Sequence, residues 1–130
     1  MTDRIIRAMD QSGHFRFFAA DTRRMAEEAR QIHRASPTAA AAMGRILTMA
    51  IFLSLDLKSL GDSLTILFKG DGPGGQLLAV TDKPCTARIS CQHPELDRPD
   101  RSPGHLDVGG IVGRQGTLTL IRKSALSKEP

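Results

Sequence analysis

The chain has 130 residues, of which 40% are hydrophobic and 25% are charged, and its formal net charge is +4 at pH 7. This composition excludes a disordered chain, and the length predicts a single domain over residues 1–130 that is large enough to bury a core. Trp and Tyr are absent and Phe occurs five times, which leaves few rings on which nucleic-acid bases would stack.

The N-terminal residues predict a β-hairpin. The first ten residues, MTDRIIRAMD, lack the uninterrupted apolar stretch of a secretory signal. Two short runs, 4–9 and 15–20, flank a polar turn that contains glycine, as in a hairpin. Phe15 and Phe17 share one face of the second strand, so we expect at least one face of the hairpin to meet the core.

Residues 22–34 change to helical spacing. Met25, Ala29 and Ile32 form one apolar stripe, and charged side chains lie mostly elsewhere. This pattern predicts an amphipathic helix, with Asp or Thr at its start as the cap.

The run from Ser36 to Leu60 predicts a central helix that is apolar on every side. Ser36 can cap the first turn, Pro37 suits the first helical position, and four alanines follow. A membrane span is the alternative for such a helix, but Arg45 and Asp56 leave only ten uncharged residues between them. We therefore expect a buried core helix, with leucines such as Leu47 and Leu53 inside.

The second half of the chain changes to a period of two, which indicates strands. A loop is expected at 92–104, because that stretch contains three prolines and almost no apolar residue. The predicted strands are 63–69, 76–82, 86–90, 105–112 and 117–122. The expected fold class is α+β, with antiparallel strands packed around the buried central helix and the one amphipathic helix.

The glycine-rich turn at 70–75 resembles a phosphate-binding loop in composition only. A P-loop ends in Gly-Lys-Ser/Thr and opens a helix, whereas here a strand follows. We interpret the glycines as supplying turn conformations and expect no nucleotide there. A serine nucleophile motif and a recognisable carboxylate pair are also missing, so an enzyme is not indicated and no catalytic residue is assigned.

The two cysteines are expected to be reduced thiols in a cytoplasmic protein. Cys85 and Cys91 would lie ~20 Å apart along an extended segment, so a disulfide between them would require a sharp bend. Cys91 and His93 are two residues apart, but no other residue completes a tetrahedral ligand set. We expect no metal and no cofactor in this chain.

Three motifs together resemble the N-terminal domain of the redox-regulated thirty-three-kilodalton heat-shock holdases of bacteria. They are SPTAAAAMGR at the central helix, KGDGPGGQLLAV at the glycine turn and LDVGGIVG near the end. The resemblance runs from the first strand to about Lys128. It implies an α+β fold and a chaperone that holds unfolding client proteins without ATP.

The resemblance also implies a zinc-binding redox switch in a C-terminal module with CxC and CxxC motifs. This sequence contains neither motif, so neither zinc nor the switch is carried over, and the chain resembles a truncated holdase core. The expected partners are unfolded clients and, in a homodimer, a second copy; no specific nucleic acid and no membrane is expected. The client-binding residues are unknown. The alternative is a basic adaptor that binds RNA or another anion through scattered arginines, including Arg4, Arg7, Arg16, Arg23, Arg24 and Arg45.

Overall fold

The structure is a computed structural model that describes residues 2–125. It contains a hairpin, a pair of helices, a second sheet and a short third helix. The elements in chain order are β1 (Arg4–Met9), β2 (Arg16–Asp21), α1 (Arg23–His33), α2 (Pro37–Ser54), β3 (Ser63–Gly70), β4 (Gln76–Thr81), β5 (Arg88–Cys91), α3 (Val108–Val112) and β6 (Gly116–Lys123).

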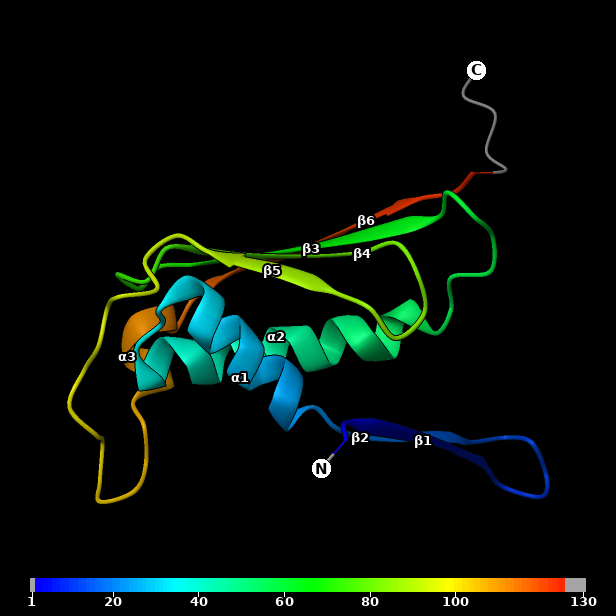
Figure 1. Cartoon of the computed structure of the whole chain (residues 1–130), viewed down its shortest axis with the longest axis horizontal. Helices are drawn as coiled ribbons and strands as arrows, with labels where there is room; N and C mark the ends of the chain where they lie inside the picture. Colours follow the sequence, from blue (N-terminus) through cyan, green and yellow to red (C-terminus); the bar gives the residue numbers. More distant parts are fainter. Residues whose placement is uncertain (1, 126–130) are drawn as a thin grey trace.

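The body of the molecule has two layers, with α1 and α2 on one face of a four-stranded sheet (Figure 1). The sheet has the order β5-β4-β3-β6, and all neighbours are antiparallel. The β1–β2 hairpin forms a separate two-stranded sheet and projects away from this body. This arrangement confirms the α+β fold with antiparallel strands around a central helix.

Helix α2 begins where the sequence predicts, because Ser36 Oγ accepts a hydrogen bond from the backbone N–H of Ala39 at 3.1 Å. The helix ends at Ser54, six residues before the end of the apolar run. Ser54 Oγ accepts from the backbone N–H of Cys85, which ties this end to the β4–β5 turn. Leu47 is buried as expected, whereas Leu53 is only half-buried.

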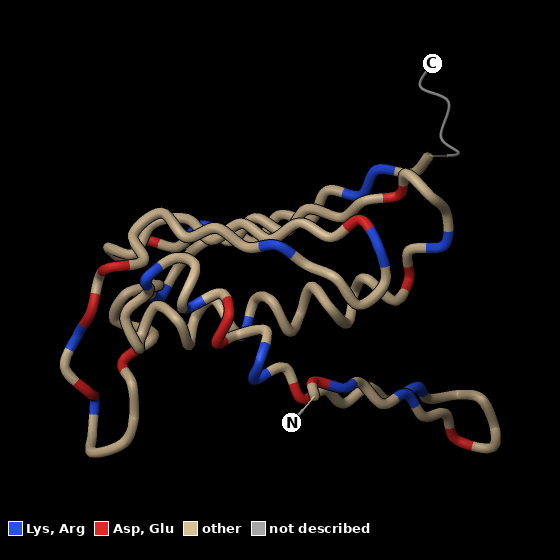
Figure 2. The backbone as a smooth tube through the Cα atoms, in the orientation of Figure 1, with Lys and Arg blue, Asp and Glu red and all other residues tan. Residues whose placement is uncertain are grey.

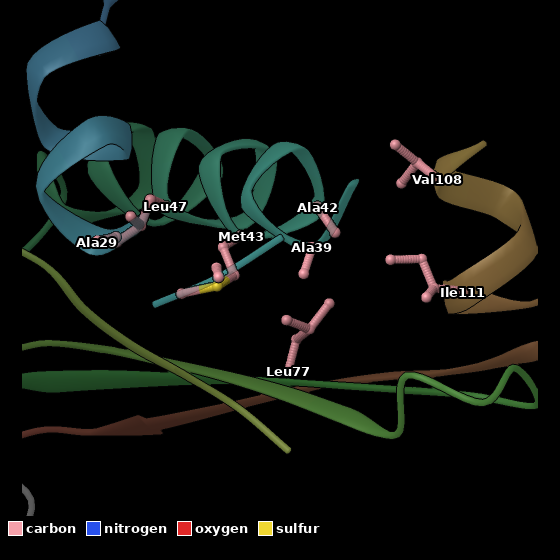
Figure 3. Packing of buried hydrophobic residues seen from close by; sticks show 9 residues of the cluster. Ala29, Ala39, Ala42, Met43, Leu47, Leu77, Val108 and Ile111 are labelled. Carbon is pink, nitrogen blue, oxygen red and sulfur yellow. The ribbon is translucent and has the colours of Figure 1, made fainter. Parts of the chain in front are cut away.

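By length and composition α2 is apolar enough to cross a bilayer, the one such helix within residues 2–125. In the fold, however, it packs as a core helix: Met43, Leu47 and Ala50 are buried beneath the sheet. Figure 3 shows the side chains of Met43 and Leu77 in the space between the helix and the sheet. These apolar side chains of α2 are therefore covered by contacts within the protein.

Helix α1 packs on α2, but its cap comes from outside the helix. Thr22 forms no side-chain cap, and the Asp3 carboxylate instead accepts from the backbone N–H groups of Arg24 and Met25 at 2.9 and 2.8 Å. The predicted stripe is only partly correct. Ala29 is buried, whereas Ile32 is 69% exposed.

The predicted strand at 105–112 is wrong, since Val108–Val112 forms helix α3. Asp107 caps this helix by accepting from the backbone N–H of Gly110 at 3.1 Å. The edge of β3 opposite β4 is occupied along its whole length by β6. The alternating apolar residues of the segment therefore serve one short helical face, on which Val108 and Ile111 are buried.

We expected at least one face of the hairpin to meet the core, and the contact is made through one aromatic ring, that of Phe18. Phe18 packs against Phe52 of α2 with their ring centroids 6.2 Å apart. Phe15 and Phe17 are 64% and 58% exposed. Within residues 2–125 the two strands of the hairpin pair only with each other, and its outer face remains exposed at Ile6 and Phe17.

Asp62 connects the loop after α2 to the end of β6. Its carboxylate accepts from the backbone N–H groups of Ala125 and Ser59 at 2.9 and 3.1 Å, and more weakly from that of Lys58. These bonds, with that from Ala125 first, hold the pKa of Asp62 below its ordinary value.

Asp62→Asn should therefore lower the urea midpoint at neutral pH. A lowered native pKa gives stability that is present above the ordinary carboxyl pKa and is lost as pH falls through the native value. The difference from wild type should shrink below about pH 4. Urea titrations from neutral pH to below about pH 4 measure this difference in midpoint, with Asp56→Asn, at an exposed aspartate, as the control. A difference between Asp62→Asn and wild type that does not change with pH would contradict the prediction.

Candidate functional site

The three motifs of the sequence meet at one corner of the core. Figure 3 shows Ala39 and Ala42 of α2 beside Leu77 of β4, with Val108 and Ile111 of α3 opposite. These five residues belong to a single buried cluster. Small alanine side chains let α3 and the sheet approach the helix closely, so the motifs have a packing role here.

The glycine turn packs backbone against backbone on α3. The N–H groups of Gly72 and Gly74 donate to the carbonyls of Val112 and Ile111 at 3.1 and 2.8 Å. The Asp71 carboxylate accepts from the backbone N–H of Arg114 at 2.9 Å. Two donors that a phosphate would need are thus occupied by protein carbonyls, which supports the structural interpretation of this turn.

The start of α2 is bound to the proline-rich loop. Ser36 Oγ donates to the carbonyl of Leu96 at 2.6 Å, and its N–H donates to the carbonyl of Pro94 at 2.8 Å. Thr38 Oγ1 donates to Asp97 at 2.8 Å. The Ser-Pro-Thr motif therefore holds a long loop in place as well as starting the helix.

The cysteines do not form a site together. Cys85 is exposed in the β4–β5 turn, whereas Cys91 is half-buried at the other end of β5, and both are free. Burial raises the pKa of the Cys91 thiol, which disfavours the reactive thiolate. Within residues 2–125 no group of three or more His, Cys, Asp or Glu lies close enough to hold a metal ion. A tetrahedral zinc site does not fit these donors.

Exposed apolar side chains gather on the hairpin. Its outer face follows from the register, in which Ile6 pairs with Ala19 and Ala8 with Phe17. The large apolar residues that the hairpin and its turn expose are Ile6, Met9, Phe15, Phe17 and Phe18. A two-stranded hairpin with its aromatic face in water is only marginally stable by itself. This surface is therefore suited to contact apolar side chains of another protein chain.

Arginines also lie on the hairpin, and the others of the adaptor hypothesis lie on α1 and α2. Figure 2 shows blue and red positions dispersed over the whole backbone. Arg23 is paired with Asp21 at 2.8 Å, and Arg30 with Glu27 at 2.6 Å. The Arg23 guanidinium lowers the pKa of Asp21 to about 2. The arginines of the adaptor hypothesis are therefore spread over separate elements.

A second apolar surface is the groove between α1 and β5, with a volume of about 720 Å³. Its apolar lining comes from Met25, Ala29 and Ile32 of α1, Leu47 of α2 and Ile89 of β5. Charged side chains of both signs line it as well, namely Asp3, Arg24, Glu28 and Arg88. β5 is the outer strand of its sheet, so one edge of this groove is an unpaired strand edge.

Sequence reasoning did not identify either surface. At least one face of the hairpin, without specification of which, was expected to meet the core, and Ile32 was expected in the apolar stripe of its helix. The signal for the hairpin was present as aromatic residues on a short strand pair, but their exposure depends on whether another element packs on that face. That packing is a property of the tertiary fold.

Comparisons with known proteins agree with the motifs. The family model described as Hsp33 protein matches residues 3–130. The 33 kDa chaperonin of Clostridium acetobutylicum is 37% identical over 130 residues, which cover 100% of this chain and 43% of that protein. The 33 kDa chaperonin of Gloeothece citriformis is 39% identical over 122 residues, which cover 94% of this chain and 41% of that protein.

A solved structure has the same fold. The crystal structure of the 33 kDa chaperonin from Thermotoga maritima superposes with a TM-score of 0.84 at 29% sequence identity. The match covers 94% of this chain and 41% of that chain. The chain thus spans less than half the length of the relatives that it matches. With the family model matching nearly all of its residues, the chain belongs to the Hsp33 family.

Proposed function

We propose that this chain is an ATP-independent holdase, which binds unfolding proteins through exposed apolar surface and so prevents their aggregation. The observation that carries the proposal is the uncovered outer face of the β1–β2 hairpin, with Ile6 and Phe17 exposed. Unfolding proteins expose apolar side chains, and burying them against this face is favourable without any bound nucleotide. Membership in a family whose relatives are named chaperonins supports the same activity.

The proposal includes no catalytic reaction and no redox switch. The sequence lacks the CxC and CxxC motifs of the zinc module, and Cys85 lies in the β4–β5 turn whereas Cys91 is the last residue of β5. Holdase activity of this chain should therefore not depend on oxidation. The family assignment also supports a cytoplasmic location, and the uncovered hairpin supports a homodimer as a state of the free chain.

The experiment is light scattering by a client protein that unfolds on heating, with the purified chain added and no ATP present. Suppression of scattering should be equal in reductant and after peroxide. For a client of low net charge it should change little with salt, because apolar burial is not screened. A basic adaptor would instead lose its partner steeply as salt rises.

Two outcomes would contradict the proposal. Suppression that appears only after peroxide would show that the two cysteines act as a switch. Absence of suppression in both redox states would show that this chain lacks the client-binding surface. Because neither outcome depends on nucleotide, addition of ATP serves as a control and should change nothing.

A further inference from the structure

We propose that the groove between α1 and β5 binds an extended segment of an unfolded protein as an added strand on β5. The segment would carry apolar side chains at alternate positions and a carboxylate at one end. The inference rests on the proposed holdase function and assigns it a second surface, distinct from the hairpin. Three features of the groove support it: its strand edge, its apolar lining and its charges.

The strand edge presents unpaired backbone groups. β5 pairs with β4 in the register Ala79 to Ile89 and Leu78 to Ser90. The N–H of Gln92 donates to the carbonyl of Gln76 at 3.0 Å. In an antiparallel pair of strands every second pair of opposite residues is hydrogen-bonded, so Ser90 and Leu78 form the next such pair. Ser90 therefore points its N–H and C=O toward β4, whereas Ile89 points both toward the free edge.

Nothing else within residues 2–125 occupies that edge. The sheet ends at β5, and the backbone hydrogen bonds between elements include none from Ile89. Figure 1 shows α1 alongside β5 on the helical side of the sheet. An edge strand beside a helix is the arrangement in which an extended peptide adds to a sheet and places alternate side chains in a groove.

The lining matches the side chains of such a segment. Ile89 lies on the inner face of the sheet and packs at the edge of both core clusters. Leu47 forms part of the floor, and Ile32 is largely exposed on the α1 side. A strand placed on β5 would turn every second side chain toward these residues and bury the exposed part of Ile32.

The charges favour a carboxylate where α1 and β5 begin. Arg24 lies in the first turn of α1 and forms no ion pair within the described residues. Arg88 begins β5, and its partner Asp82 is 3.8 Å away with both side chains largely exposed. Asp3 already accepts two backbone hydrogen bonds, which leaves Glu28 as the other acidic side chain of the groove. The Arg24 guanidinium is thus available to an acidic residue, and Arg88 adds positive charge at the same end of the groove.

The probe for this site is a fluorescein-labelled peptide of alternating valine and threonine that ends in glutamate. Amide hydrogen exchange by NMR is the most direct readout. With saturating peptide the exchange rate of the Ile89 amide should fall by a factor of about ten or more. The exchange rate of the Ser90 amide, which is already hydrogen-bonded to β4, should change little. Unchanged exchange at Ile89, with or without peptide binding, would overturn the proposal.

Two comparisons test the backbone and the groove separately. A peptide with N-methyl groups on alternate residues should bind about tenfold more weakly, because it cannot donate to the edge. Ile32→Glu should weaken binding by a similar factor, and the matched control Leu60→Glu, at a fully exposed leucine outside the groove, should not. Equal binding of the methylated peptide would overturn strand addition.

The charge arm uses Arg24→Glu with Arg114→Glu as its control. The first should abolish the preference for the glutamate peptide over one ending in lysine, and the second should preserve it. If all groove variants leave peptide binding unchanged while the chain still suppresses aggregation, this site is wrong and the holdase proposal stands. If suppression is also absent, the proposed function fails as well.

Discussion

Leu47→Ala is expected to lower the free energy of unfolding by about 2 to 5 kcal/mol, a large part of the stability of a domain this size. Leu47 is 2% exposed and lies in the cluster where α1 and α2 pack against each other and against the sheet. Truncation removes the transfer free energy of the buried methyl groups and leaves a cavity in the core.

Urea unfolding followed by far-UV circular dichroism measures this change, since the chain has no Trp or Tyr for fluorescence. Leu60→Ala is the matched control, because Leu60 is fully exposed and its truncation should leave the midpoint within error of wild type. A Leu47→Ala midpoint equal to that of wild type would mean that α2 does not form the core that the fold describes.

Gly72→Ala should also destabilise the fold strongly, by about 3 kcal/mol or more. A Cβ added at Gly72 would lie 2.3 Å from the carbonyl oxygen of Ile111 and 2.5 Å from the backbone nitrogen of Gly113. Both neighbours are backbone atoms, so no side chain can rotate away. The glycine turn and α3 would have to separate, which breaks the hydrogen bond from Gly72 N–H to Val112.

Gly109→Ala provides the comparison within the same corner. A Cβ at Gly109 would meet nothing within 4 Å, and the residue lies inside α3, where alanine is the better helix former. Its urea midpoint should equal or slightly exceed that of wild type. A Gly72→Ala midpoint no lower than that of Gly109→Ala would refute the proposed backbone contact.

Local chemistry made much of the fold predictable. Ser36 and Pro37 specify the start of α2 through their own side chain and ring, and the glycine turn at 70–75 specifies the β3–β4 hairpin. These signals act over a few residues, so they do not depend on the rest of the chain. The helix end was less predictable, because Ser54 is held by a bond to Cys85, far away in sequence.

The failures come from long-range competition. Residues 105–112 alternate like a strand, but β6 already fills the edge of β3, and Asp107 supplies a helix cap. The hairpin alternates in the same way, yet Ile6 and Phe17 on its outer face are exposed. A pattern of alternation reports which side chains share a face, and it does not report what covers that face.

The candidate binding surfaces were not predictable for the same reason. Ile32 and Phe17 are ordinary core residues by type and spacing, and only the tertiary arrangement leaves them exposed. The motifs that led to the family, by contrast, have structural roles at the corner of α2, α3 and the glycine turn. Sequence therefore indicated the family more clearly than it indicated the surface that would bind a client.

The most direct test of the account compares Phe17→Ser with Leu60→Ser in the light-scattering assay without ATP. Both substitutions remove an exposed apolar side chain, but only Phe17 lies on the outer face of the hairpin. Phe17→Ser should suppress aggregation clearly less than wild type at equal concentration, and Leu60→Ser should match wild type. Equal suppression by all three proteins would contradict the claim that the hairpin captures unfolding clients.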